Sequence, residues 1–180
     1  MKAQHFIISL FLLLFTGCAS DNSEQLVTID DRYSIILPGF LSEASDLNGD
    51  ASLQYQNLFK EFYAIVIDEP KEEVHTVIDD NDLQDYYSKD LDGYTSLLLA
   101  GMLNDIETDS ISDLEEKVIN GFNARKITFS GKTDGVDIFF YFCFIEGKEH
   151  YYQVMTWTTT KKRDKYLPKM VKLTESFNEQ

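Results

Sequence analysis

Residues 136–159 read VDIFFYFCFIEGKEHYYQVMTWTT, and this stretch decides the fold of the chain. It holds eight aromatic residues, and both alternating faces of its first half are apolar. One face carries Ile138, Phe140, Phe142 and Phe144, and the other carries Phe139, Tyr141, Cys143 and Ile145. This pattern is typical of a strand buried on both sides. Glu146, Gly147 and Lys148 interrupt the run, so residues 148–159 are predicted to fold back as the antiparallel partner.

Further strands are predicted ahead of this hairpin, because short apolar and β-branched runs alternate there with turn residues. They span residues 26–29, 33–37, 52–57, 62–68, 115–119 and 122–130. The first two predict an N-terminal hairpin, and Pro38 and Gly39 end its second strand. The last two enclose a turn at Asn120 and Gly121 and lead through residues 131–135 into the aromatic hairpin. Four consecutive strands therefore predict a meander.

An apolar stripe at spacings of three and four residues predicts a helix over residues 83–102. The stripe consists of Leu83, Tyr87, Leu91, Tyr94, Leu98 and Met102. Residues 79–82 offer candidate N-cap side chains, and Asp82 and Asp85 place negative charge at the expected helix start. Residues 104–113 are polar and acidic, so we expect them to form a surface connection.

A second amphipathic helix is predicted within residues 160–177. Its inner face consists of Leu167, Met170, Val171, Thr174 and Phe177. Pro168 has no N–H to donate, so the main helix is predicted either to begin there or to kink there. The two helices and the N-terminal hairpin can cover both faces of the sheet. We therefore predict an α+β fold: one domain over residues 26–180, built as an α/β/α sandwich around a central antiparallel sheet with flanking helices.

The first seventeen residues predict a signal peptide. Lys2 supplies a positive start, and residues 6–15 form an apolar run too short to span a bilayer as a helix. Two small residues and Cys18 follow, and this arrangement resembles the lipobox of bacterial lipoproteins. Phe15 departs from that pattern, in which Leu is the usual residue.

The lipobox resemblance implies cleavage before Cys18 and transfer of a lipid to its thiol, which would anchor the protein to a membrane. Residues 18–25 would then be the lipidated, palmitate-carrying cysteine and a short tether. Ala19 is not the Asp associated with retention in the inner membrane, so the outer membrane of the cell envelope is the favoured location. An ordinary secretory signal cut after Ala19 is the alternative.

The chain is acidic, with 16 Lys and Arg against 31 Asp and Glu and a net charge of −15. Removal of residues 1–17 takes away one of these charges, on Lys2, and leaves 15 against 31. Such a chain is expected to repel phosphate backbones and anionic lipid surfaces, which argues against nucleic acid as a partner. If Cys18 is acylated, only Cys143 remains, so we expect no intrachain disulfide and a buried thiol that packs as a small hydrophobe.

The order of several short motifs resembles the PsbP-like superfamily, which includes the photosystem II subunit PsbP and the bacterial lipoprotein DcrB. The motifs are Leu37, Pro38, Gly39 and Phe40; Ile119, Asn120, Gly121, Phe122, Asn123 and Ala124; the Gly135 hairpin; Tyr151, Tyr152 and Trp157; and Tyr166, Pro168, Ser176 and Phe177. They cover most of the mature chain. The resemblance implies a binding or assembly scaffold without a shared active site, and no functional residue carries over by position.

Catalytic and metal-binding patterns are weak. Hydrolase chemistry needs a nucleophile, a base and an orienting group, yet the only histidines beyond residue 17 are His75 and His150, and no serine lies in a G-x-S-x-G elbow. We therefore predict no catalytic, cofactor-binding or metal residues. The candidates considered for calcium are Asp46, Asn48 and Asp50, where Ala51 and Asn57 break the loop pattern, and Asp79, Asp80, Asp82 and Asp85, which are also explained as helix-capping and solvated residues.

Opposite charges gather in two segments. Residues 68–92 carry ten acidic side chains, whereas residues 161–172 carry six basic ones against Asp164. They are either two poles that orient a partner or ordinary solvated helix faces.

The function that we expect is a lipid-anchored, non-catalytic envelope factor that binds or assembles another protein. The alternative is a lipoprotein that binds a small ligand or cation, and a hydrolase comes third.

Overall fold

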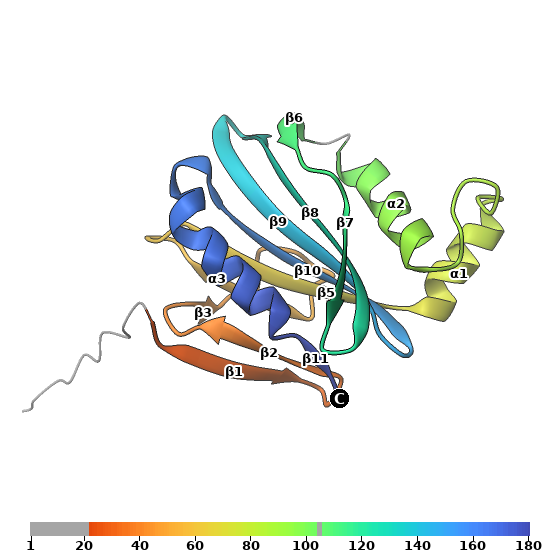
Figure 1. Ribbon diagram of the computed structural model, residues 1–180, viewed down its shortest axis with the longest axis horizontal. Coiled ribbons are helices and arrows are strands. Elements are labelled where there is room, and N and C mark those ends of the chain that lie inside the picture. The colour runs from red at the N-terminus through yellow and green to blue at the C-terminus, as the bar shows by residue number, and fades with distance from the viewer. Residues whose placement is uncertain (1–21, 104–105) are drawn as a thin grey trace, which may run out of the picture.

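The computed structural model describes residues 22–103 and 106–180 (Figure 1). The predicted signal peptide and Cys18 lie outside the described residues. The strands are β1 (Glu24–Ile29), β2 (Tyr33–Pro38), β3 (Ser42–Glu43), β4 (Leu53–Asn57), β5 (Phe62–Pro70), β6 (Glu107–Ile111), β7 (Glu115–Ile119), β8 (Phe122–Thr133), β9 (Val136–Glu146), β10 (His150–Thr159) and β11 (Asn178–Glu179). The helices are α1 (Lys71–Asp80), α2 (Leu91–Met102), the 3-10 turn η1 (Thr160–Lys162) and α3 (Arg163–Glu175). None of these described helices is long and apolar enough to cross a membrane.

The aromatic hairpin lies at the centre of an antiparallel sheet, as predicted. The strand order is β3-β4-β5-β10-β9-β8-β6, and β7 pairs with β8 beside β6. β9 and β10 are aligned from Tyr151 opposite Glu146 to Thr159 opposite Ile138. The predicted meander of β7, β8, β9 and β10 is therefore confirmed. Two-residue turns with positive φ close the β7–β8 and β8–β9 hairpins, at Asn120 and Gly121 and at Asp134 and Gly135.

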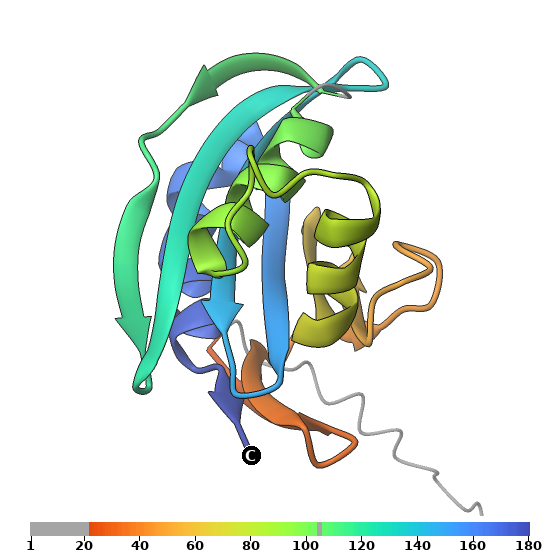
Figure 2. The same cartoon turned by 90° about the vertical axis from the view of Figure 1, so that its right-hand side faces the viewer.

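The two faces of β9 enter two separate hydrophobic cores, which confirms the prediction of a strand buried on both sides. The first core contains Phe139, Tyr141, Cys143 and Ile145, together with buried side chains of β2 and α3. The second core contains Phe142 and Phe144, packed with buried side chains of α1 and α2. Figure 2 shows α1 and α2 over one face of the sheet, with α3 behind it. The α/β/α sandwich is thus confirmed.

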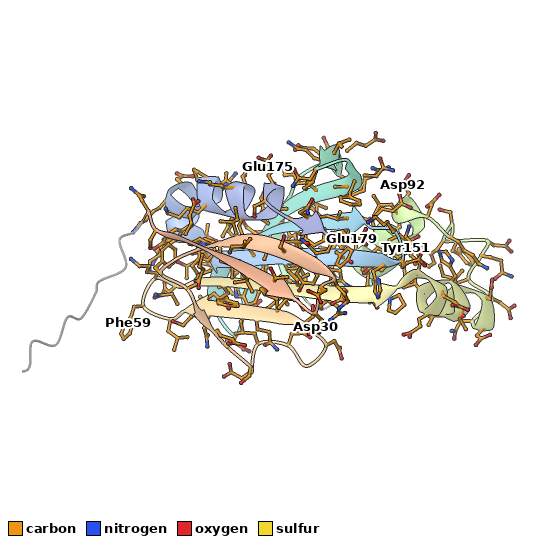
Figure 3. The ribbon with its side chains drawn as sticks, turned by 90° about the horizontal axis from the view of Figure 1, so that it is seen from below. Asp30, Phe59, Asp92, Tyr151, Glu175 and Glu179 are labelled. Atoms are coloured by element: carbon orange, nitrogen blue, oxygen red, sulfur yellow. The ribbon has the colours of Figure 1, made fainter. Side chains whose placement is uncertain are left out.

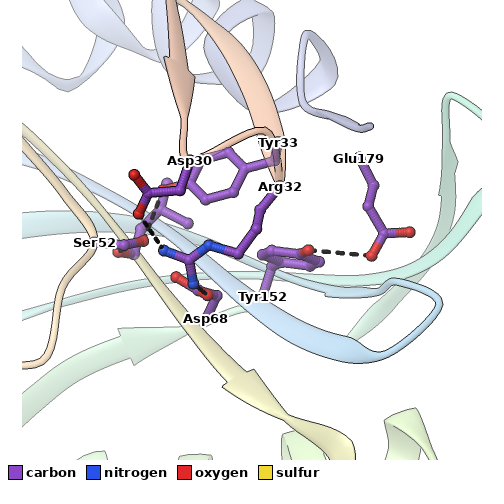
Figure 4. A network of polar contacts seen from close by, with 8 residues as sticks. Asp30, Arg32, Tyr33, Ser52, Asp68, Tyr152 and Glu179 are labelled. Carbon is purple, nitrogen blue, oxygen red and sulfur yellow. Dashed lines mark hydrogen bonds and ion pairs between the residues drawn. The ribbon is translucent and has the colours of Figure 1, made fainter.

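The N-terminal hairpin is held over the first core by aromatic and polar contacts (Figure 4). Tyr33 of β2 packs against Tyr152 and Phe177, with ring centroids 5.5 and 5.4 Å away. Arg32, in the β1–β2 turn, forms an ion pair with Asp68 of β5, whose side chain is only 3% exposed. Burial raises the pKa of Tyr33 well above its ordinary value, so its hydroxyl stays neutral beside Ser52 at 2.8 Å. This network joins the small sheet β1-β2-β11 to the central sheet.

The helices on the second-core face differ from the prediction. The structure has two helices there: α1, which the sequence prediction missed, and α2, which begins at Leu91 rather than near Leu83. Asp90 is the N-cap of α2, and its carboxylate accepts the N–H of Gly93 at 2.9 Å. Residues 79–82 instead end α1 and turn the chain. Leu83 keeps its place in the apolar stripe because it packs against the second core from this turn.

Three further boundaries need correction. Residues 104–113 include β6, because the long strand β8 needs a partner beyond Lys126, where its pairing with β7 stops. α3 begins at Arg163, so Pro168 lies inside the helix and does not start it. The domain also begins before residue 26, since Gln25 lies in β1 and donates its side-chain amide to the carbonyl oxygen of Leu41 at 2.9 Å.

Candidate functional site

A cleft of about 590 Å³ opens on the second-core face, where α1 and α2 approach β5 and β10. Its apolar lining consists of Ile67, Leu98, Met102 and Met155, and its polar lining includes Asn48, Asp50, Glu69, Glu73 and Gln153. A smaller pocket of about 150 Å³ between α1 and α2 shares Glu69, Glu73 and Leu98 with it. We call the two together the α1–α2 cleft. Methionines suit a site that adapts to its ligand, because the unbranched thioether side chain repacks easily.

Glu69 is fixed in the cleft by two donors. The hydroxyl of Tyr94 donates to Glu69 Oε2 at 2.5 Å, and the amide of Gln153 donates to the same oxygen at 2.9 Å. Tyr94 is 1% exposed and stacks on Tyr151 with ring centroids 4.4 Å apart. Burial, and next the negative charge of Glu69, raise the pKa of Tyr94 far above its ordinary value. The phenol therefore stays neutral and donates, which holds a carboxylate at a defined position.

One edge of β5 forms part of the cleft lining. β4 pairs with β5 only from Phe62 to Val66, and the N–H of Ser52 donates to the carbonyl oxygen of Val66 at 2.9 Å. Beyond that point, no strand within the described chain pairs with residues 67–70 on this side of β5. A strand edge of this kind can add a strand from an extended peptide.

The charge of the cleft is negative. Asp50, Glu69 and Glu73 line it, whereas Asp68 is already paired with Arg32. The nearest cation in sequence, Lys71, lies 3.2 Å from Glu146 and its amine lies over the ring of Tyr151, 5.1 Å from the centroid. The described contacts thus direct Lys71 toward the β9–β10 turn. A ligand with positive charge and some apolar surface matches this lining best.

Local contacts hold the first calcium candidate and one residue of the second. Asn48 accepts the backbone N–H of Asp50 at 2.8 Å, and the Gln54 side chain bonds the backbone of Leu47 and Asn48. In the second cluster, Asp79 pairs with Lys89 at 2.5 Å. Within residues 22–103 and 106–180, no three His, Cys, Asp or Glu side chains lie close enough together to hold a metal ion.

The other candidates for chemistry occupy structural positions. His75 lies on α1, where its Nε2 is 3.3 Å from the hydroxyl of Tyr151. His150 begins β10, with its ring centroid 6.0 Å from that of Tyr152. Cys143 is a free, buried thiol, as predicted, and burial raises its pKa to about 12. Such a thiol is a poor nucleophile because little of it is ionised.

The two charged segments lie on opposite faces of the sheet (Figure 1). The acidic segment forms the end of β5, α1 and the start of α2, whereas the basic segment forms η1 and most of α3. The α1–α2 cleft belongs to the acidic face. Sequence reasoning identified both segments but not the cleft, because the cleft unites residues from four separate stretches of the chain.

Comparison with known proteins shows the fold of the chain. No family model and no curated protein matches the chain. The cyanobacterial PsbP protein (CyanoP) of Synechocystis sp. PCC 6803 is similar at a TM-score of 0.54 and 10% identity, over 92% of this chain and 96% of that protein. LpqN, which is involved in cell envelope biogenesis of Mycobacterium tuberculosis, is similar at a TM-score of 0.56 and 9% identity, over 88% and 91%. The sequence motifs, the two-faced sheet and these likenesses agree: the chain has the PsbP-like fold.

Proposed function

We propose that this protein is a lipid-anchored, non-catalytic accessory factor of the bacterial cell envelope that binds another protein in the α1–α2 cleft. The observation that carries the proposal is the cleft itself, which combines a methionine-containing apolar lining, a fixed carboxylate and an unpaired strand edge. The involvement of LpqN in cell envelope biogenesis supports an envelope role for a protein of the same fold.

The cleft favours an extended partner segment that carries Lys or Arg between aliphatic residues. Residues 67–70 of β5 would pair with its backbone, and Glu69 and Glu73 would attract its positive charges. Leu98 and Met102 would cover its apolar side chains. Strand addition gives affinity through the backbone, so the acidic lining would supply most of the selectivity.

A non-catalytic role is supported by the surroundings of the candidate nucleophiles and bases. The described side-chain partner of the His75 ring is a tyrosine hydroxyl, and Cys143 is 1% exposed. Hydrolytic catalysis by either residue would need an accessible nucleophile next to a base.

The anchor part of the proposal is tested at Cys18. Cys18→Ser should give a precursor that keeps its signal peptide and takes up no labelled palmitate in growing cells, whereas Cys143→Ser should be processed and labelled normally. Processing and labelling of Cys18→Ser would show that the lipid is attached elsewhere or not at all.

The partner is tested by photocrosslinking in cells. A crosslinking amino acid at Leu98, in the cleft, is compared with one at Val118, which is 71% exposed on β7. Leu98 should capture a specific envelope protein that Val118 does not. Glu73→Lys should reduce that product several-fold, and Asp109→Lys, an equal charge change on exposed β6, should not. Identical products from both positions, or none from Leu98, would refute binding in the cleft.

A small organic cation is the second candidate for the same cleft, because about 590 Å³ lies within the usual range for small-molecule sites. It would compete with the partner segment for Glu69 and Glu73. Loss of the Leu98 crosslink when membranes isolated from these cells are saturated with a polyamine, but not with sodium chloride of the same ionic strength, would favour a small organic cation.

A further inference from the structure

The turn between β4 and β5 exposes an apolar tip. Leu58 is 64% exposed and Phe59 is 97% exposed. A single exposed apolar side chain is ordinary on a protein surface, but a fully exposed phenylalanine next to a leucine at the end of a hairpin is less so. The residues around this tip indicate which kind of surface it contacts.

A basic side chain of η1 contacts the tip, and a basic side chain of α3 shares a ring, Phe40, with a lysine of the tip. The Lys162 amine of η1 donates to the carbonyl oxygens of Phe59 at 3.4 Å and Lys60 at 3.2 Å. The amine of Lys60, in the turn itself, lies 5.1 Å from the ring centroid of Phe40. The amine of Lys169, in α3, lies 6.0 Å from the same centroid. The acidic Glu61 pairs with Lys162 at 2.9 Å. The tip therefore lies beside the basic segment, residues 161–172, although the net charge of the chain is −15.

The chain enters the domain beside this tip. The carbonyl oxygen of Ser23 accepts the N–H of Gly39 at 2.7 Å, and Gly39 precedes Phe40, over which the two lysines lie. Figures 1 and 3 both place Phe59 or its turn at the end of the molecule where the first described residues lie. Cys18 precedes Asn22 by four residues, and four residues span at most about 14 Å. A lipid on Cys18 would bring a bilayer within reach of the tip.

We propose that this end, formed by residues 58–61, η1 and the start of α3, docks on the surface of an anionic phospholipid bilayer. Phe59 and Leu58 enter the interface, and Lys161 and Lys165, both exposed, contact lipid phosphates. The inference rests on the lipid anchor of the proposed function. Burial of one phenylalanine contributes roughly ten- to hundred-fold in binding, and each lysine near an anionic surface about five-fold. The acidic face and its cleft then point away from the membrane.

The test places a spin label at Phe59→Cys in the full-length protein, in nanodiscs of phosphatidylglycerol and phosphatidylethanolamine. The matched control is Tyr86→Cys, since Tyr86 is 79% exposed on the opposite, acidic face. Cys143 is buried and should take no label. The label at Phe59 should be accessible to oxygen and shielded from a water-soluble nickel chelate, whereas the label at Tyr86 should show the reverse. A label at Phe59 as accessible to the chelate as the one at Tyr86 would overturn the proposal.

A charge variant separates docking from anchoring. Lys161→Glu with Lys165→Glu should return the Phe59 label to water, and Lys117→Glu with Lys148→Glu, an equal charge change elsewhere, should not. Mass spectrometry of Cys18 in each preparation reports the anchor. Acylated Cys18 with a water-exposed Phe59 label overturns docking and leaves the anchor standing. A lipid-embedded label with unmodified Cys18 supports docking and removes the anchor. A label exposed in nanodiscs but protected by a protein in cells identifies a protein interface and overturns lipid docking.

Discussion

Removing the guanidinium of Arg32 should destabilise the fold more than a typical surface substitution. The side chain of Asp68 is 3% exposed, and its partner Arg32 is 35% exposed. Breaking a buried ion pair by removing one partner costs about 3–5 kcal/mol, because the other charge stays buried. Water reaches the arginine side of this pair, so we expect Arg32→Met to lose about 2–3 kcal/mol of unfolding free energy. For a chain of this length, that loss lowers Tm by about 4–12 °C.

Urea unfolding followed by the fluorescence of Trp157, the single tryptophan, measures this loss. Asp30→Asn is the control, because Asp30 also contacts Arg32, at 3.1 Å, but is 80% exposed and should cost less than about 0.5 kcal/mol. Arg32→Met combined with Asp68→Leu leaves no buried charge, so most of the stability should return. The reasoning is refuted if Arg32→Met costs less than about 1 kcal/mol, or if the double variant is no more stable than the single one.

Three other predictions concern α2 and the core. Gly93→Ala should destabilise the protein, although alanine usually favours a helix by about 1 kcal/mol, because the added Cβ would lie 1.8 Å from the carbonyl oxygen of Ser88; a gain in Tm would contradict this. Hydrogen bonds from Ser88 and Gly93 hold the pKa of Asp90 below its ordinary value. The contribution of Asp90 to the free energy of unfolding is therefore fully present above that ordinary value and is lost as the pH falls through the folded-state pKa. Asp90→Ala should therefore cost about 1 kcal/mol at pH 7 and little near pH 2, as measured by urea unfolding at both pH values. Cys143, whose pKa is raised to about 12, should react with a thiol reagent at pH 8 only after unfolding; rapid labelling of the native protein would show that the strand opens.

The central architecture could be predicted because its signals are local. A run that is apolar on both alternating faces requires cover on both sides, and β9 has this cover. The Asn120 and Gly121 turn was predicted because both residues tolerate positive φ, and their φ angles are 49° and 92°. Residues 83–102 misled the prediction because a turn can continue an apolar stripe: Leu83 packs against the same core as α2 without being helical.

The sequence contains a signal for α1 that the prediction missed. Val74 and Ile78 are four residues apart and buried, and Glu72 and Glu73 follow Pro70 in the first turn. The α1–α2 cleft left none, because its residues meet only through pairings such as Gln153 opposite Ile67. A single sequence does not show which strands pair, so it cannot bring Glu69, Tyr94 and Gln153 together.

The small sheet β1-β2-β11 has a consequence for the order of events during synthesis. Its first two strands are made early, but the third pairs with Ser34 and Tyr33 only when residues 178–179 exist. The side-chain amide of Gln180 donates to the hydroxyl of Ser34, 146 positions away in the sequence. Closing so long a loop costs conformational entropy before the contacts between its ends can form. A growing chain therefore carries only the two strands β1 and β2 of this sheet until residues 178–179 have been made, and β11 is the last of the described strands to pair.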